Sequence, residues 1–165
     1  MISGKAIKYG DNVNTDVILP GKYLELSLNS MELSKHAMEG LDPSFAEKVQ
    51  GGAILVAGKN FGCGSSREEA PLALKYAGVK CVLAESFARI FYRNAINIGL
   101  PAVECGGVSG RVEEGDELTV DLENGTVKNQ SKGVTLHATQ LPPFILEILS
   151  DGGLIENLRK RMKGK

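Results

Sequence analysis

Residues 58–71, GKNFGCGSSREEAP, combine three glycines, two adjacent serines, an arginine and two glutamates in one short stretch. The stretch follows an apolar run and precedes a helical pattern, which is where open α/β sheets bind their ligands. A glycine-rich loop exposes backbone N–H groups, and Ser65, Ser66 and Arg67 add two hydroxyls and a guanidinium. This combination indicates a site for a carboxylate or a phosphate group.

Two familiar glycine-rich phosphate motifs do not fit this stretch. A P-loop has Lys before its Ser or Thr, whereas Gly64 precedes Ser65, and the third glycine of a dinucleotide fingerprint is missing. Ser65 and Glu68 also fit a capping box, in which Ser65 would begin the next helix. Pro71 would then lie inside that helix, so either its first turn is irregular or the regular helix starts near Ala70.

The surrounding pattern predicts a parallel α/β arrangement. Three apolar runs predict buried strands, and two amphipathic stretches predict the helices between them. The strands are expected within 51–58, 79–86 and 100–105, and the helices within 69–78 and 86–99. Ser86 is the expected N-cap of the second helix.

The rest of the chain has different predicted secondary structure. Asn124-Gly125, between alternating apolar residues, predicts a β-hairpin within 116–129. A closing helix is expected to begin near Pro143 and to end before Gly152. The first forty residues predict one strand, an irregular stretch at 10–29 and a short helix after Ser30. We expect one α/β domain over residues 1–165.

Composition narrows the classes of partner and compartment. The 165 residues are 42% hydrophobic and 24% charged, with a formal net charge of −1. This balance argues against nucleic acid and an anionic membrane as partners. No run approaches the ~18 apolar residues of a membrane span, and the first ten residues lack the apolar core of a signal peptide. We therefore expect a cytoplasmic protein.

The cysteines and histidines predict no metal site in this chain. Cys63, Cys81 and Cys105 are odd in number and widely spaced, which fits a reducing compartment without disulfides. His36 and His137 have no partner at ligand spacing and are interpreted as structural.

Arg89 and Arg93 are four residues apart on an expected helix. They form either a cationic stripe or, as we favour, surface ion pairs with acidic residues.

Three segments together resemble a known family. NFGCGSSRE (60–68) resembles the serine–arginine loop in the swivelling domain of the aconitase superfamily. NVNTDVILPGKYL (12–24) resembles the Asn-Thr-Asp loop of that domain and its substrate-selecting loop, and SFARIFYRNAINIGLP (86–101) resembles a third block. With its length, the chain is similar to the separate small subunits of 3-isopropylmalate dehydratases, enzymes of leucine biosynthesis.

The resemblance implies a β/β/α swivelling domain that closes over a large subunit, in a heterodimer or heterotetramer. It places a 4Fe–4S cluster on that large subunit and no cofactor on this chain. The implied reaction dehydrates a small 2-hydroxy-dicarboxylate and rehydrates it at the neighbouring carbon. By the same resemblance Ser65 is the catalytic base, acting as an alkoxide, and Arg67 binds a substrate carboxylate. The other residues implied at the substrate are Gly64, Ser66, Thr15 and Asp16, although an Asx turn is the alternative for Asp16.

The segment Tyr23-Leu24-Glu25-Leu26 corresponds to the family's specificity loop. Members that act on tricarboxylates tend to place an arginine where this chain has Glu25, so no cation is expected here for a third carboxylate. Leu24 and Leu26 suit an apolar arm instead. The alternatives are a homoaconitase or methylmalate or dimethylmalate hydratase subunit, and a non-catalytic carboxylate- or phosphate-binding module.

Overall fold

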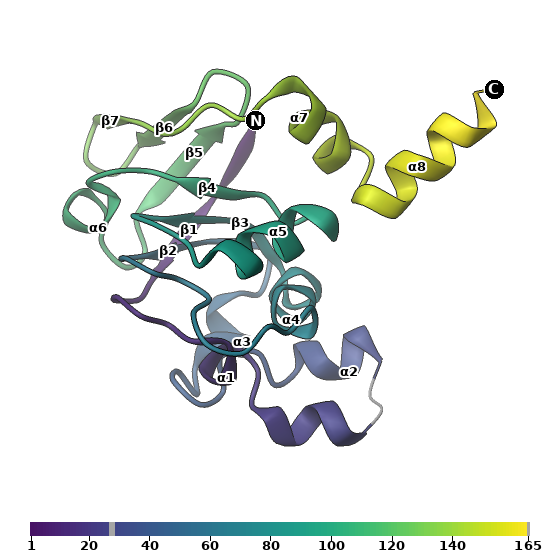
Figure 1. Cartoon of the computed structure of the whole chain (residues 1–165). Helices are drawn as coiled ribbons and strands as arrows, with labels where there is room; N and C mark the ends of the chain where they lie inside the picture. Colours follow the sequence, from purple (N-terminus) through teal and green to yellow (C-terminus); the bar gives the residue numbers. More distant parts are fainter. Residues whose placement is uncertain (27–28, 165) are drawn as a thin grey trace.

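The computed structural model describes residues 1–26 and 29–164 (Figure 1). Within these residues seven strands form one sheet with the order β4-β3-β2-β1-β5-β6-β7. The strands are β1 (Ile2–Lys8), β2 (Ala53–Ala57), β3 (Val79–Ala84), β4 (Ala102–Glu104), β5 (Glu117–Asp121), β6 (Thr126–Asn129) and β7 (Val134–His137).

Helices lie before, between and after these strands. They are α1 (Thr15–Ile18), the 3₁₀ helix η1 (Gly21–Leu26), α2 (Ser30–Ser34), α3 (Phe45–Lys48), α4 (Glu69–Ala77), α5 (Arg89–Asn97), α6 (Val108–Arg111), α7 (Pro143–Ser150) and α8 (Leu154–Lys163). None of the described helices is long and apolar enough to cross a membrane.

The parallel half of the sheet, β1 to β4, confirms the predicted α/β core. Every residue of β2 is buried, because helices cover one face of this half and other strands cover the opposite face. Leu55 and Val82, from neighbouring strands, pack in one cluster with apolar side chains of α1 to α5. This face is the helical layer of the domain (Figure 1).

The antiparallel half, β5 to β7, continues from β1 and supplies the second β layer. Its apolar face packs in the same cluster as the other face of β1 to β3, so the sheet curls over itself. The members of this cluster include Ala6, Ile54, Val56, Leu83, Leu118, Val120, Val127 and Leu136. The result is the expected β/β/α arrangement.

Two local expectations are wrong. The stretch 10–29 is not irregular throughout, because α1 and η1 form within it; residues 27–28 lie outside the described residues. The side chain of Asn14 caps α1 by accepting the Val17 N–H at 2.9 Å. Ser86 does not cap α5, which begins at Arg89, since its hydroxyl accepts the Asn60 N–H at 2.8 Å.

The hairpin, the short helix after Ser30 and the start of α7 at Pro143 are confirmed. Strand β7 was not predicted. After Gly152 and Gly153 the chain turns and continues as α8, which extends away from the sheet (Figure 1). The basic residues from Arg159 to Lys163 therefore form the end of a second helix.

Candidate active site

The loops that follow β1, β2 and β3 meet at the carboxyl edge of the parallel strands. Gly62 N–H donates to Val13 O at 2.7 Å, and Phe61 N–H donates to Ser86 O at 3.1 Å. These bonds prolong the pairing of the strands beyond their ends. The loop in the middle, residues 58–68, is called the serine loop below, and it is held from both sides.

Gly62 fixes how closely the serine loop approaches α5. Its φ is +82°, and a Cβ at this position would lie 2.2 Å from Phe91 Cγ. The Phe61 and Phe91 rings meet edge to face with centroids 5.1 Å apart, and Phe87 stacks parallel to Phe91. Only glycine fits this contact, and the three rings form a packed base under the loop.

Ser65 lies on the exposed part of the serine loop, outside any helix. Thr15 Oγ1 donates to Ser65 O at 2.8 Å, which ties the loop to the start of α1. Within the described residues, the Ser65 hydroxyl has no hydrogen-bond partner. Helix α4 begins at Glu69 without a side-chain cap. The capping-box interpretation of Ser65 is therefore wrong, and the alternative, a regular helix that starts near Ala70, is confirmed.

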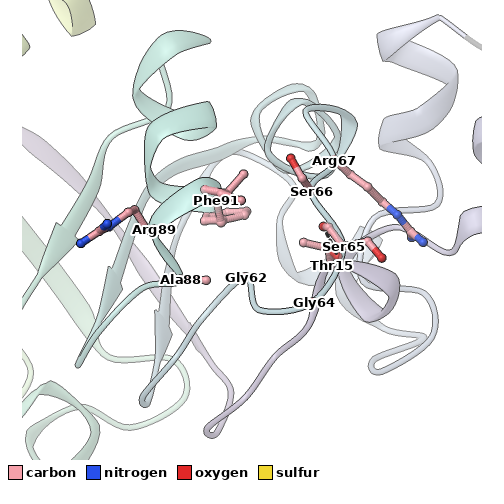
Figure 2. Close-up of a pocket in the computed structure, with 10 residues that line it drawn as sticks. Thr15, Gly62, Gly64, Ser65, Ser66, Arg67, Ala88, Arg89 and Phe91 are labelled. Carbon is pink, nitrogen blue, oxygen red and sulfur yellow. Dashed lines mark hydrogen bonds between the residues drawn. The ribbon is translucent and has the colours of Figure 1, made fainter.

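A pocket of about 180 Å³ opens beside Ser65 (Figure 2). The serine loop and Thr15 form one wall, and the start of α5 forms the other. The lining residues are Thr15, Gly62, Gly64, Ser65, Ser66, Arg67, Ala88, Arg89, Ile90 and Phe91. The wall that Ala88 to Phe91 provide was not predicted as part of the site, although the segment belongs to the third block of the resemblance.

Arg67 lines the pocket, but its guanidinium extends away from Phe91 and Arg89 (Figure 2). Arg67 Nη1 donates to Asp16 Oδ1 and to Leu19 O, both at 3.1 Å. Asp16 Oδ1 also accepts the Gly21 N–H at 3.1 Å. The Gly21 N–H and the Arg67 guanidinium hold the pKa of Asp16 below its ordinary value. Asp16 is thus charged at neutral pH and positions Arg67.

The predicted specificity segment lies outside this pocket. Tyr23 and Leu24 pack against the core, whereas Glu25 is exposed and Leu26 is 60% exposed. Contact of these four side chains with a substrate stays a prediction.

Tyr23 is anchored by Glu39, which the sequence did not point to, and by His36, which was interpreted as structural. Its hydroxyl donates to the carboxylate of Glu39, and its ring stacks on His36 with centroids 3.8 Å apart. His36 Nδ1 in turn lies 2.8 Å from Glu39 Oε2. The anchor joins η1 to the segment after α2.

All three cysteines are free, and Cys81 and Cys105 are buried in the same apolar cluster. Burial raises the pKa of Cys81 to about 12 and that of Cys105 to about 11, so both thiols stay protonated at neutral pH. Cys63 is on the serine loop and is half-buried. Among the described residues, no group of three or more His, Cys, Asp or Glu side chains is placed to hold a metal ion.

Arg89 and Arg93 are exposed on α5, and neither forms an ion pair within the described residues. The favoured interpretation as surface ion pairs is therefore wrong. No acidic residue lies three or four positions from either arginine except Glu85, and its carboxylate accepts the N–H groups of Gly107 and Ser109 instead.

Comparison with known proteins supports the resemblance. The sequence profile of the aconitase C-terminal domain matches residues 11–105. The chain is 58% identical over 162 residues to the 3-isopropylmalate dehydratase small subunit of Halothermothrix orenii, covering 98% of each chain. It is 57% identical to the isopropylmalate/citramalate isomerase small subunit of Methanocaldococcus jannaschii, covering 98% of this chain and 96% of that protein.

A solved structure agrees. The crystal structure of 3-isopropylmalate dehydratase (leuD) from Methanocaldococcus jannaschii superposes with a TM-score of 0.91 at 45% identity, covering 98% of this chain and 95% of that one. The chain belongs to the aconitase C-terminal domain family and, within it, to the 3-isopropylmalate dehydratase small subunits.

Proposed function

We propose that this chain is the small subunit of a 3-isopropylmalate dehydratase, which interconverts 2-isopropylmalate and 3-isopropylmalate in leucine biosynthesis. The observation that carries the proposal is 58% identity over almost the whole chain to a protein of that name. The serine loop, with Ser65, Ser66 and Arg67 beside a pocket, supplies the matching chemistry. In this proposal residues 1–165 act as one swivelling domain.

The partner in this proposal is a large subunit, in a heterodimer or heterotetramer, as the term small subunit implies for the relatives. In this proposal that subunit holds a 4Fe–4S cluster, as the family resemblance implies. The cluster supplies the Lewis acid that the departing hydroxyl needs. The residues of this chain supply the base and part of the carboxylate binding.

Ser65 is proposed to act on the C–H bond. Dehydration removes a weakly acidic proton from one carbon and the hydroxyl from its neighbour. Rehydration in the opposite sense places the hydroxyl on the first carbon and a proton on the second. A serine hydroxyl is too weak an acid to ionise unaided, so its alkoxide needs backbone N–H groups and positive charge nearby. Gly64 and Ser66 flank Ser65 with such N–H groups, and Arg67 follows.

Arg67 is proposed to bind a carboxylate of the substrate. Its guanidinium has five N–H donors, and the contacts with Asp16 and Leu19 both use Nη1. The Nη2 and Nε donors have no hydrogen-bond partner within the described chain, and together they form a fork that fits a carboxylate. Asp16 then orients the fork, and Thr15 holds the backbone of Ser65 beside it.

Citramalate is a second candidate substrate, favoured by the relative that is named an isopropylmalate/citramalate isomerase. Citramalate carries a methyl group where 2-isopropylmalate carries an isopropyl group, and the two share the hydroxyl and both carboxylates. An apolar arm is compatible with Leu24 and Leu26, while Glu25 offers no cation for the third carboxylate of homoaconitate.

The experiment is anaerobic reconstitution with a large subunit and an assay with isopropylmalate, citramalate and homoaconitate. We expect the complex to turn over isopropylmalate and the lone chain to be inactive even after incubation with iron and sulfide. Turnover by the lone chain contradicts the proposed placement of the cluster. A stable complex without isopropylmalate turnover contradicts the proposed function.

A further inference from the structure

A second hollow, of about 330 Å³, lies between α5 and α7. Tyr92, Ile96 and Ile145 give it apolar surface, and Arg89 and Arg93 add two cations. This α5–α7 groove, which also includes Asn97, is defined by those six residues.

The cations of the groove have no partner within the described chain. Arg89 and Arg93 are one helical turn apart, and like charges at that spacing repel each other. Glu104 is near Tyr92, whose pKa is raised by burial and by that carboxylate, but Glu104 is not within ion-pair distance of either arginine. The pair therefore gives the isolated chain no stabilisation and suits an acidic partner.

The apolar part of this face is also incompletely covered. Ile90, next to Arg89, is 53% exposed, and Phe144 on α7 is 59% exposed. None of the residues of α7 is buried, although the helix carries four aliphatic side chains. Arginines beside partly exposed aliphatic and aromatic side chains are the composition that protein interfaces favour.

The groove is continuous with the candidate active site. Arg89 lines both the α5–α7 groove and the pocket beside Ser65. A partner that closes the pocket against water must therefore approach Arg89 and the start of α5. In the proposed function that partner is the large subunit.

We propose that the α5–α7 groove docks an acidic and apolar segment of the large subunit, with Arg89 and Arg93 pairing with carboxylates of that segment. This inference rests on the proposed function, since the large subunit is the occupant. Arg93 is the better residue to test, because it lines the groove but not the pocket.

The test compares Arg93→Glu with Lys128→Glu. Both reverse the charge of an exposed side chain that forms no ion pair with the described residues, and Lys128 lies on β6 in the antiparallel half of the sheet. The affinity for the purified holo large subunit is measured anaerobically at low and high salt. We expect Arg93→Glu to weaken binding at least ~10-fold at low salt and less at high salt, because screening weakens exposed ion pairs.

Lys128→Glu should bind within about twofold of the wild type, and Arg93→Gln should lie between the wild type and Arg93→Glu. Thermal unfolding of each variant checks that the fold is intact. If Arg93→Glu binds the large subunit within twofold of the wild type, the inference is overturned. It is also overturned if Arg93→Glu abolishes self-association of this chain without changing its affinity for the large subunit. If the wild-type complex forms and is active while the inference fails, the proposed function still stands.

Discussion

Asp16 and Arg67 form an ion pair in which Oδ1 and Nη1 are 3.1 Å apart. The pair joins the serine loop to the segment that leads into η1, because Asp16 Oδ1 also accepts the Gly21 N–H. The Asp16 side chain is 69% exposed, so the pair contributes little to the free energy of unfolding. Its importance is geometric, since it sets the direction of the guanidinium.

Arg67→Lys should raise KM for isopropylmalate by about 10–100-fold in the complex, with a smaller change in kcat. A lysine ammonium cannot present a planar fork to a carboxylate while it contacts Asp16. Steady-state kinetics measure the effect. Arg161→Lys is the control, because Arg161 is also ion-paired, to Glu147, but lies on α8. An unchanged KM for Arg67→Lys would show that Arg67 does not bind the substrate.

Gly62→Ala should lower the free energy of unfolding by about 2–4 kcal/mol, because the new Cβ meets the Phe91 ring and the backbone has a positive φ. Chemical denaturation measures the loss. Gly106→Ala is the control: nothing lies within 4 Å of a Cβ there, and its change should stay within about 0.5 kcal/mol. Equal stabilities for the two variants would argue against the close approach of the serine loop to α5.

Tyr23→Phe should raise the pKa of Glu39, because hydrogen bonds from Tyr23 and then His36 lower that pKa in the wild type. A carboxyl whose folded pKa is lowered stabilises the protein above its unfolded pKa, about 4.3, and this contribution is lost as the pH falls through the folded value. The wild type should therefore be more stable than the variant at pH 7, with a smaller difference below pH ~4.

An NMR titration of Glu39 and thermal unfolding at several pH values measure these effects. Tyr76→Phe is the control, since Tyr76 is exposed and its hydroxyl has no hydrogen-bond partner within the described chain. A pKa of Glu39 that is the same in the wild type and in Tyr23→Phe would show that the anchor is absent in solution.

The wild-type complex should prefer isopropylmalate to homoaconitate by at least ~100-fold in kcat/KM, because an unpaired carboxylate is costly to bury. Glu25→Arg should narrow this ratio, since it adds a cation to the specificity segment. Glu25→Gln removes the charge without adding a cation and should narrow the ratio less. Citramalate should be turned over with a lower kcat/KM than isopropylmalate, because it lacks two CH₂ units of the apolar arm, each worth ~1–3 kcal/mol, but it brings no unpaired third carboxylate. Equal turnover of homoaconitate and isopropylmalate would contradict this account of the segment.

The parallel strands were predictable because each is a short apolar run that is buried on both faces, as in β2. Strand β7 was missed because it has only four residues, too few for the alternation of Val134 and Leu136 with exposed Thr135 and His137 to be recognised. The serine loop was recognisable from its glycines and adjacent polar side chains. The sequence did not decide where the helix after this loop begins. Pro71 left two possibilities, an irregular first turn from Ser65 or a regular helix from near Ala70, and α4 in fact begins at Glu69 with Pro71 in its first turn.

The anchor of Tyr23 could not be predicted from local pattern. Tyr23 and Glu39 are 16 residues apart, and they meet only because η1 and the segment after α2 pack against the same core. The absence of ion pairs at Arg89 and Arg93 within the described residues was better signalled, because Glu85 is the one acidic residue three or four positions from either arginine. The spacing of residues along a helix thus predicts which side chains share one of its faces. Contacts between loops that are distant in the sequence can be predicted only when the fold is known.

The most direct measurement is kcat of the Ser65→Ala complex with isopropylmalate, beside that of Ser66→Ala. Ser65 is exposed and its hydroxyl has no partner within the described chain, so both variants should unfold within about 2 °C of the wild type. We expect Ser65→Ala to lower kcat by at least ~1000-fold with little change in KM, as loss of a base predicts. Ser66→Ala keeps its backbone N–H and should stay within ~10-fold. A Ser65→Ala complex with kcat within tenfold of the wild type would contradict the assignment of Ser65 as the base.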